Sequence, residues 1–285
     1  DLDTAIEGGV GARYRRALVH EEQRTRLDAV ERRADRGFVI RDATAAEVTA
    51  QLAARELWRT RKRDFANDAV GVRHALARLE AVLARVDRDL ACDLFFAEER
   101  RYWEQRNRAA RIQKRRQDAL GLGWGNHDHH TFRCSRERFT GLMDFLRRLG
   151  FERRERFYAG AEAGWGAQIS EQATAGIVVF ADVDLMSDET EIDFSTEPLP
   201  PAPKLGTVGL WCALHGDSFL QAGMHHLEAR FDFARLKTQL ATEGVETMKP
   251  FSDFEFLRQA FTAGEGWPVR PTRLAALLKA ELITE

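Results

Sequence analysis

Glycine and proline are distributed very unevenly along this chain of 285 residues, and this constrains its fold more than any other feature. All seven prolines lie after position 197, and 16 of the 21 glycines lie after position 120. Residues 72–120 contain neither, and they are rich in Ala, Leu, Arg, Glu and Gln, which favour helices. Apolar residues such as Leu76, Leu79 and Leu83 recur there every three to four positions. The pattern predicts a long helix or a helical hairpin.

The first 65 residues have a similar composition. They suggest helical runs near Arg13–Asp35 and Thr44–Ala66, which Gly37 and Asp42 separate. We therefore predict a helical region over residues 1–120.

After position 120 the sequence changes to short β-type segments between glycines, which predicts a second domain over residues 121–285. Two helices are expected within it, at Arg136–Leu149 and Phe233–Glu243, and each is followed by a glycine suited to end a helix. The expected strands are Phe151–Tyr158, Gly166–Ser170, Ala175–Asp184 and Thr207–Leu214. The Pro-rich and acidic residues 188–204 are expected to form a linker.

Composition narrows the function classes. Apolar segments are far shorter than the ~20 residues of a membrane span, so no membrane partner is expected. Three separated cysteines favour a reducing cytoplasm over a disulfide scaffold. The net charge is +5 over residues 1–120 (26 basic, 21 acidic) and −7 over 121–285 (17 basic, 24 acidic). Acidic residues are interleaved with the basic ones, so no nucleic-acid partner is expected. The chain starts at Asp1 without a Met, which favours a fragment or trimmed chain.

A weak internal repeat is the most informative motif. His129-x-x-x-Arg133 and His226-x-x-x-Arg230 each precede an expected helix, a glycine stop and an expected strand. In a strand, residues four apart share one face. The repeat predicts two β-α-β-β-β modules, at about 126–187 and 205–275, with the two histidines in equivalent positions.

Clustered histidines favour a metal site, because neutral imidazole is a common ligand of Fe, Zn, Cu and Ni. Two histidines and one carboxylate would leave positions open for substrate. A shift of one residue would replace His129 and His226 by His130 and His225. Trp165, Phe180 and Trp211 are expected in the core or around a pocket. The candidate carboxylates are Glu171, Asp182, Glu228 and Glu265.

Residues 121–285 resemble the vicinal oxygen chelate superfamily, and within it the 2-oxoadipate dioxygenase/decarboxylase family. The residues that carry the resemblance are His129 with Arg133, His225-His226-Leu227 with Arg230, Leu257-Arg258-Gln259, Glu265, and Val269-Arg270-Pro271. The family's Phe-Gly-Glu triplet is Ala-Gly-Glu in this chain.

The resemblance implies an α+β fold in which paired β-α-β-β-β modules form a cupped mixed sheet around one metal ion. It implies His129, His226 and Glu265 as ligands of Fe(II), with Zn, Ni or Mn as alternatives, and Arg133 as the clamp for a substrate carboxylate. The implied function is oxidative decarboxylation of a small 2-oxo acid with dioxygen. Two alternatives stay open: a redox-silent glyoxalase-like isomerase, lyase or hydrolase, and a non-enzymatic helical scaffold. Homo-oligomerisation through the helical region is a further expectation.

Overall fold

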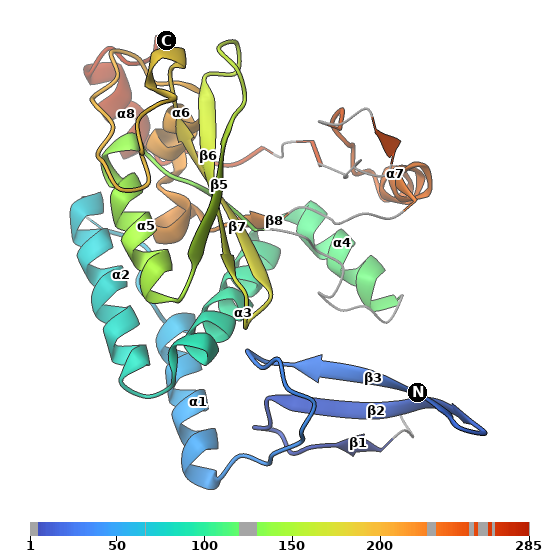
Figure 1. The fold of residues 1–285 in the computed structure, drawn as a ribbon. Coiled ribbons are helices and arrows are strands. Elements are labelled where there is room, and N and C mark those ends of the chain that lie inside the picture. The colour runs from blue at the N-terminus through green and yellow to red at the C-terminus, as the bar shows by residue number, and fades with distance from the viewer. Residues whose placement is uncertain are drawn as a thin grey trace.

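A computed structural model of the chain describes residues 5–65, 67–119, 130–226, 232–250, 254–255, 262–263 and 266–284. The described residues form an α+β fold with two separate sheets and surrounding helices (Figure 1). The strands are β1 (Ile6–Glu7), β2 (Tyr14–Glu22), β3 (Thr25–Arg32), β4 (His130–Arg133), β5 (Glu152–Tyr158), β6 (Trp165–Gln172), β7 (Ile177–Asp184) and β8 (His225–His226). The α-helices are α1 (Ala45–Arg59), α2 (Asp68–Leu83), α3 (Arg88–Arg106), α4 (Arg108–Ala119), α5 (Phe139–Arg148), α6 (Thr207–His215), α7 (Phe233–Thr242) and α8 (Pro271–Lys279).

The larger sheet has the strand order β5-β6-β7-β4-β8. Strand β4 runs parallel to β7, and the other neighbouring pairs are antiparallel. Because α5 connects β4 to β5, the segment from β4 to β7 is a β-α-β-β-β unit whose first strand lies beside its last. This is the element order predicted for residues 126–187.

The larger sheet has two chemically different faces. Side chains alternate along a strand, so Phe132 on β4 and Ala181 on β7 share one face, which we call the helix face. Arg133 and Asp182 are paired in register on the other face, which we call the Arg133 face. The helix face is apolar at Phe132, Val179 and Ala181, although the buried polar residues His130 and Gln168 share it. The Arg133 face carries charged groups close to the carboxyl ends of β4 and β7.

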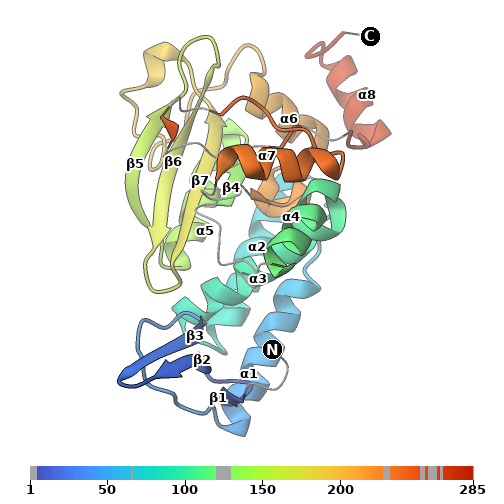
Figure 2. The same cartoon turned by 90° about the vertical axis from the view of Figure 1, so that its right-hand side faces the viewer.

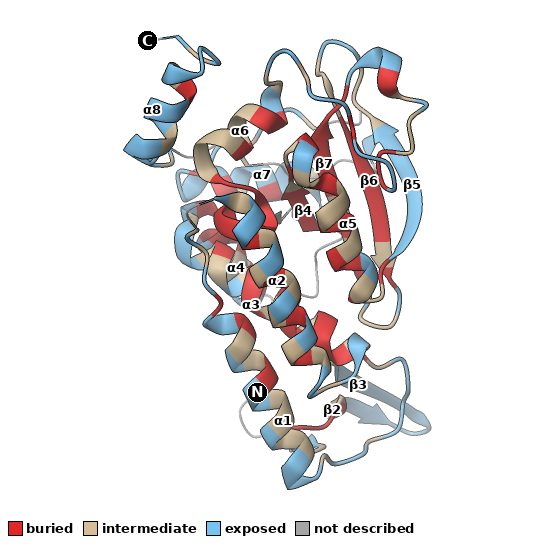
Figure 3. Ribbon diagram, turned by 90° about the vertical axis from the view of Figure 1, so that its left-hand side faces the viewer, coloured by how far each residue is buried: buried red, intermediate tan, exposed pale blue. Residues whose placement is uncertain are grey.

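Aromatic side chains fill the space between the helix face and the helices. Phe95 of α3 lies with its ring centroid 5.1 Å from those of Trp58 in α1 and Phe145 in α5. Phe132 of β4 is fully buried and lies 5.9 Å from Phe96. Helix α5 buries residues three to four positions apart, as an amphipathic helix against a sheet requires (Figure 3).

One hydrophobic cluster contains residues from both sides of the predicted boundary at position 120. Ala54, Leu79 and Phe96 belong to it together with Phe132 and Val179. The helical region therefore packs against one face of the larger sheet.

A second, smaller cluster joins α4 to α7. Ala109 and Ile112 of α4 pack against Leu236 and Leu240 of α7, and Figure 2 shows the two helices side by side. Arg108 donates to the carbonyl oxygen of Gly244, just after the end of α7. The basic character of α4 therefore serves in part to hold α7.

The helix predicted at Arg13–Asp35 is wrong. Residues 6–32 form a three-stranded antiparallel sheet, β1-β2-β3, and the β2–β3 hairpin turns at Gln23, whose φ is +50°. Its residues have high helix propensity but no apolar stripe for a helix to bury, and they pair instead along the length of β2 and β3. Partly exposed ion pairs join the neighbouring strands. Arg15 pairs with Glu31 at 2.9 Å and Arg16 with Glu7 at 2.8 Å.

The strand predicted at Thr207–Leu214 is also wrong, because this segment is helix α6. A short apolar run does not distinguish a strand from a buried helix. The buried Asp184 carboxylate decides between them by accepting from the backbone N–H groups of Gly206, Val208 and Gly209, at 2.7 to 2.9 Å. A Cβ at position 209 would collide with Asp184, so the helix start needs glycine there.

The second module is therefore less complete than predicted among the described residues. Within 205–275 these comprise α6, β8, α7, the start of α8 and an isolated bridge between Thr247 and Thr262. Strand β8 precedes α7, in the order expected of such a module. None of the described helices is long and apolar enough to cross a membrane.

Candidate functional site

Arg133 ends β4 on the Arg133 face and is held there by its backbone and by an aromatic ring. Its N–H donates to Oγ of Ser218 at 2.9 Å, and its guanidinium carbon lies 4.9 Å from the centroid of Trp211 on α6. Burial lowers the pKa of Arg133, and the nearby Asp182 charge opposes this shift. Among the described residues, no carboxylate lies within ion-pair distance of the guanidinium. The guanidinium is thus largely buried, yet its N–H donors remain available to a ligand.

Asp182 lies beside Arg133 on the neighbouring strand β7 and is only 8% exposed. Burial raises the pKa of Asp182 to about 7, and the charge of Arg133 only partly opposes this. No donor among the described residues hydrogen-bonds to its carboxyl group. Asp182 therefore changes its charge near neutral pH, in direct proximity to a cation.

Aromatic rings lie on one side of the Arg133–Asp182 pair. The rings of Trp211, His215 and Trp267 lie 5.5 to 5.9 Å from one another. Burial, and then the positive charges of Arg106, Arg273 and Arg133, lower the pKa of His215. The site thus combines the Arg133 cation, a carboxyl group that is neutral below about pH 7, a neutral imidazole and two indoles, with Arg106 and Arg273 close to the imidazole.

Helix α6 is positioned rigidly with respect to the two strands. Its first turn is fixed by Asp184, which lies two residues after Asp182 on β7. Asp217, fully buried just after α6, accepts from the N–H of Ser135 at 2.9 Å, two residues after Arg133. Trp211 is therefore tied to both strands that carry the Arg133–Asp182 pair.

The three predicted metal ligands are only partly within the described residues. His129 and Glu265 lie outside them, and for His226 only the backbone is described. That backbone pairs with His130 in the β4–β8 ladder, and His225 pairs with Thr131. The structure thus brings the 225–226 segment beside the residue that follows His129 in sequence.

His130, the alternative ligand, is engaged with the protein. Its Nε2 lies 3.1 Å from Nη1 of Arg100, which can only donate, so the ring proton is on Nδ1, facing the carbonyl oxygen of Val178 at 3.3 Å. The ring also packs edge-on against Phe96 at 4.9 Å. Neither ring nitrogen of His130 is available to a metal ion in this arrangement.

The remaining carboxylate candidates differ in environment. Glu171 is half-exposed and pairs with Arg154 at 3.6 Å, whereas Asp182 is buried at the Arg133 site. Glu228 lies outside the described residues. Within the described ranges, no group of three or more His, Cys, Asp or Glu side chains is arranged to hold a metal ion.

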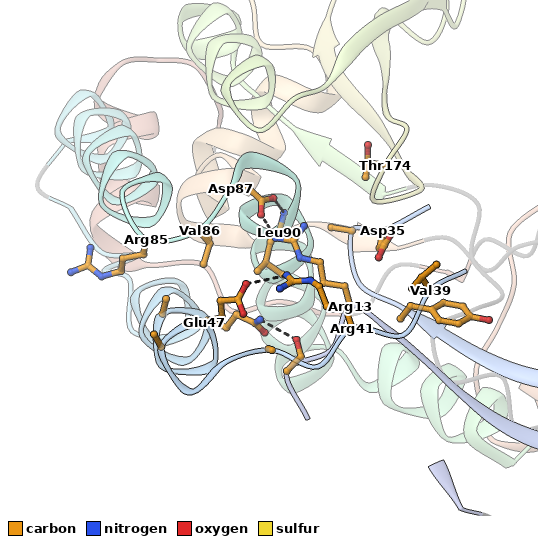
Figure 4. Close-up of a pocket in the computed structure, with 17 residues that line it drawn as sticks. Arg13, Asp35, Val39, Arg41, Glu47, Arg85, Val86, Asp87, Leu90 and Thr174 are labelled. Carbon is orange, nitrogen blue, oxygen red and sulfur yellow. Dashed lines mark hydrogen bonds and ion pairs between the residues drawn. The ribbon is translucent and has the colours of Figure 1, made fainter. Parts of the chain in front are cut away.

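A cleft of about 680 Å³ lies away from this site, between the N-terminal sheet and the ends of α1 and α3 (Figure 4). Four of its charged groups form ion pairs, Arg13 with Asp87 and Arg41 with Glu47 at 3.0 Å. Asp35 accepts from the N–H of Gly37, and Arg85 donates to the carbonyl oxygen of Ala81. Glu47 also caps α1 through Thr44. These contacts stabilise the junction between the sheet and the helices and leave no buried polar group without a partner in the cleft.

Arg133 was predicted as the substrate clamp and Asp182 as a candidate metal carboxylate, while Trp211 was expected in the core or around a pocket. His215 belongs to the histidine cluster that favoured a metal site, and Trp267 was not predicted. Asp182 could be recognised from the sequence, because Asp182 and Asp184 are acidic residues at alternate positions in the otherwise apolar β-type run Ile177–Asp184. Trp267 had no such signal, because only the folded chain brings α6 to the residues before α8.

Comparison with protein-family models, with curated proteins and with solved structures finds no match to this chain.

Proposed function

We propose that this chain is a metal-dependent enzyme that binds a small carboxylic acid on the Arg133 face, with the paired-module architecture of the vicinal oxygen chelate superfamily. The proposed reaction is oxidative decarboxylation of a 2-oxo acid by dioxygen, with Fe(II) as cofactor. The observation that carries the proposal is the Arg133 guanidinium, which is largely buried against Trp211 and has no carboxylate partner among the described residues.

The chemistry of this arrangement suits a carboxylate ligand. A guanidinium presents parallel N–H donors that match the two oxygens of a carboxylate. A buried cation without a partner is unfavourable, so a bound anion would relieve the cost of burying it. Trp211 would hold the guanidinium plane, and the fixed plane would set the direction from which the carboxylate approaches.

Metal binding is proposed for His129, His226 and Glu265. The pairing of β8 with β4 places the 225–226 backbone beside the start of β4, with position 225 opposite Thr131 on the Arg133 face and position 226 opposite His130 on the helix face. The proposed set therefore rests on the sequence resemblance, and His225 is the alternative to His226. Fe(II) held there would supply the activation of dioxygen. The residues of the chain would orient the 2-oxo acid through Arg133 and exclude water with the Trp211, His215 and Trp267 rings.

Metal analysis of anaerobically purified protein, combined with oxygen uptake, tests the proposal. We expect iron in about one equivalent per chain and oxygen consumption that depends on added 2-oxo acids. Zinc without oxygen uptake would contradict the iron assignment and favour an isomerase, lyase or hydrolase. A metal-free, fully folded protein that binds no metal would contradict the enzyme proposal.

The substrate role of Arg133 is tested by Arg133→Gln. We expect this variant to keep its metal and to lose about 10²-fold or more in kcat/KM, since truncating one partner of a buried charge pair costs about 2–5 kcal/mol. Arg154→Gln, which removes a half-exposed arginine on β5, is the matched control and should behave like the parent chain. Equal activity of the two variants would refute the clamp.

A further inference from the structure

We infer that Arg133 and Asp182 form one two-part carboxylate site, in which the guanidinium supplies the charge and the Asp182 carboxyl group donates a hydrogen bond to the same bound carboxylate. The inference rests on the carboxylate site of the proposed function. It names Asp182 as the residue whose protonation determines whether a ligand carboxylate is bound together with a proton.

The geometry of the sheet places both groups toward one ligand. Arg133 and Asp182 are register partners on parallel strands, so their side chains leave the same face at neighbouring positions. The next register partner on that face is Ala167 of β6, whose methyl group supplies neither charge nor hydrogen bond. A ligand held by Arg133 therefore meets Asp182 as its nearest polar neighbour on the sheet.

The absence of a direct ion pair is informative. Two opposite charges at neighbouring buried positions would normally associate, yet Arg133 and Asp182 do not come within ion-pair distance in the described structure. Instead, the guanidinium packs on Trp211, and the Asp182 carboxyl group has no hydrogen-bond partner among the described residues. Asp182 is 8% exposed, and its carboxyl oxygens are not among the fully buried polar atoms without a partner, so a ligand oxygen can reach the carboxyl group and bond to it.

The other charged or titratable groups near Asp182 have partners or are neutral. Asp184, two residues along β7, is bound to the N-terminus of α6, and Glu171 of β6 pairs with Arg154. On α6, burial raises the pKa of the Cys212 thiol and lowers the pKa of His215, which keeps both neutral near pH 7. Among these groups, Arg133 is thus the charge that interacts with the Asp182 carboxyl group when Asp182 gains or loses its proton.

The consequence is that a carboxylate binds together with a proton. Below about pH 7 Asp182 is already protonated, because burial raises its pKa to about 7, and the proton needs no external source. Above that pH the Asp182 carboxylate repels the ligand, so binding takes up one proton from solvent. With full coupling, affinity should fall roughly 30-fold between pH 6 and pH 8.5.

Isothermal titration calorimetry of the full chain with glutarate and with 2-oxoglutarate tests the inference. The protein is first freed of metal on a chelating resin, so that neither a metal ion nor a soluble carboxylate chelator contributes to binding. Titrations at pH 7.5–8 in buffers of different ionisation enthalpy measure the protons taken up. We expect close to one proton and a roughly 30-fold loss of affinity from pH 6 to 8.5. Asp182→Asn, whose amide still donates a hydrogen bond, should bind without proton uptake and with nearly constant affinity. Glu155→Gln, a change at an exposed carboxylate of β5, should retain the parent behaviour.

Identical pH dependence in the parent chain and in Asp182→Asn would overturn the inference, and so would failure of the parent chain to bind either acid. The outcome is distinguishable from that of the proposed function. If binding is coupled to a proton but the protein contains no iron and consumes no oxygen, the dioxygenase proposal is contradicted and the two-part site is supported. If oxygen uptake depends on iron but binding does not depend on pH, the dioxygenase proposal is supported and the two-part site is contradicted.

Discussion

The two faces of the five-stranded sheet are built on opposite principles. On the helix face, Phe132 and Ala181 are completely removed from water among aromatic neighbours. On the Arg133 face, the residues next to them in sequence, Arg133 and Asp182, bring charge into a buried environment without pairing with each other. Burial stabilises the fold on the first face and costs free energy on the second. Tolerance of that cost suggests that the Arg133 face serves ligand binding.

The largest effect should come from breaking the helix face. Phe132→Ala removes a fully buried ring that contacts Phe95 and Phe96, and truncation of a buried Phe costs about 3–5 kcal/mol. Urea unfolding followed by circular dichroism measures the change. A cost below 1 kcal/mol would mean that the helix face is not the main core.

The next effect concerns Asp182 and depends on pH. The folded chain keeps the Asp182 proton up to about pH 7, whereas an unfolded aspartic acid loses it near pH 4. Because the folded state binds more protons between these values, stability falls as pH rises from about 4 to 7. Asp182→Asn should remove this loss and be more stable than the parent at pH 8 by up to about 4 kcal/mol.

The measurement is thermal or urea unfolding of both proteins at pH 4.5 and pH 8, with Glu155→Gln as the control for removal of an exposed carboxylate. The stability advantage of Asp182→Asn should shrink toward zero at the lower pH. An advantage that is the same at both pH values would show that Asp182 does not titrate in this range.

The smallest stability effect is expected for Arg133→Met, which keeps an aliphatic side chain against Trp211. The guanidinium has no carboxylate partner to lose among the described residues, and replacing a poorly compensated buried charge by an apolar group is often neutral. We expect a change below about 1 kcal/mol in unfolding free energy. A loss above 3 kcal/mol would assign Arg133 to the structural core.

Local patterns predicted the elements that pack on a core. The spacing of Phe139, Leu142 and Phe145 gives α5, and the run Ile177–Asp184 gives β7. Residues 72–119 are mostly helical as predicted, but they form parts of three helices, α2, α3 and α4, rather than one long helix or a hairpin. Where tertiary contacts decide, local patterns failed. Residues 14–32 pair as a hairpin despite their helix propensity, and the backbone N–H groups bound by Asp184 begin a helix at residues 207–215.

Only the part of the candidate site that lies on a single strand could be predicted from the sequence. Arg133 follows from the His-x-x-x-Arg motif, and its place on the sheet agrees with the alternation of side chains along β4. The approach of Trp211 from α6 depends on a helix that the sequence pattern suggested to be a strand. The pairing of Arg133 with Asp182 depends on a register between strands about 50 residues apart, which hydrophobic patterning does not specify.

The most direct test of the central claim is a crystal structure of the full chain grown with 2-oxoglutarate at pH 6. The account predicts that a ligand carboxylate lies within hydrogen-bond distance of both the Arg133 guanidinium and the Asp182 carboxyl group, with Trp211 still stacked on the arginine. A well-ordered ligand bound elsewhere, such as in the cleft beside Arg13 and Glu47, with no density at Arg133, would contradict it.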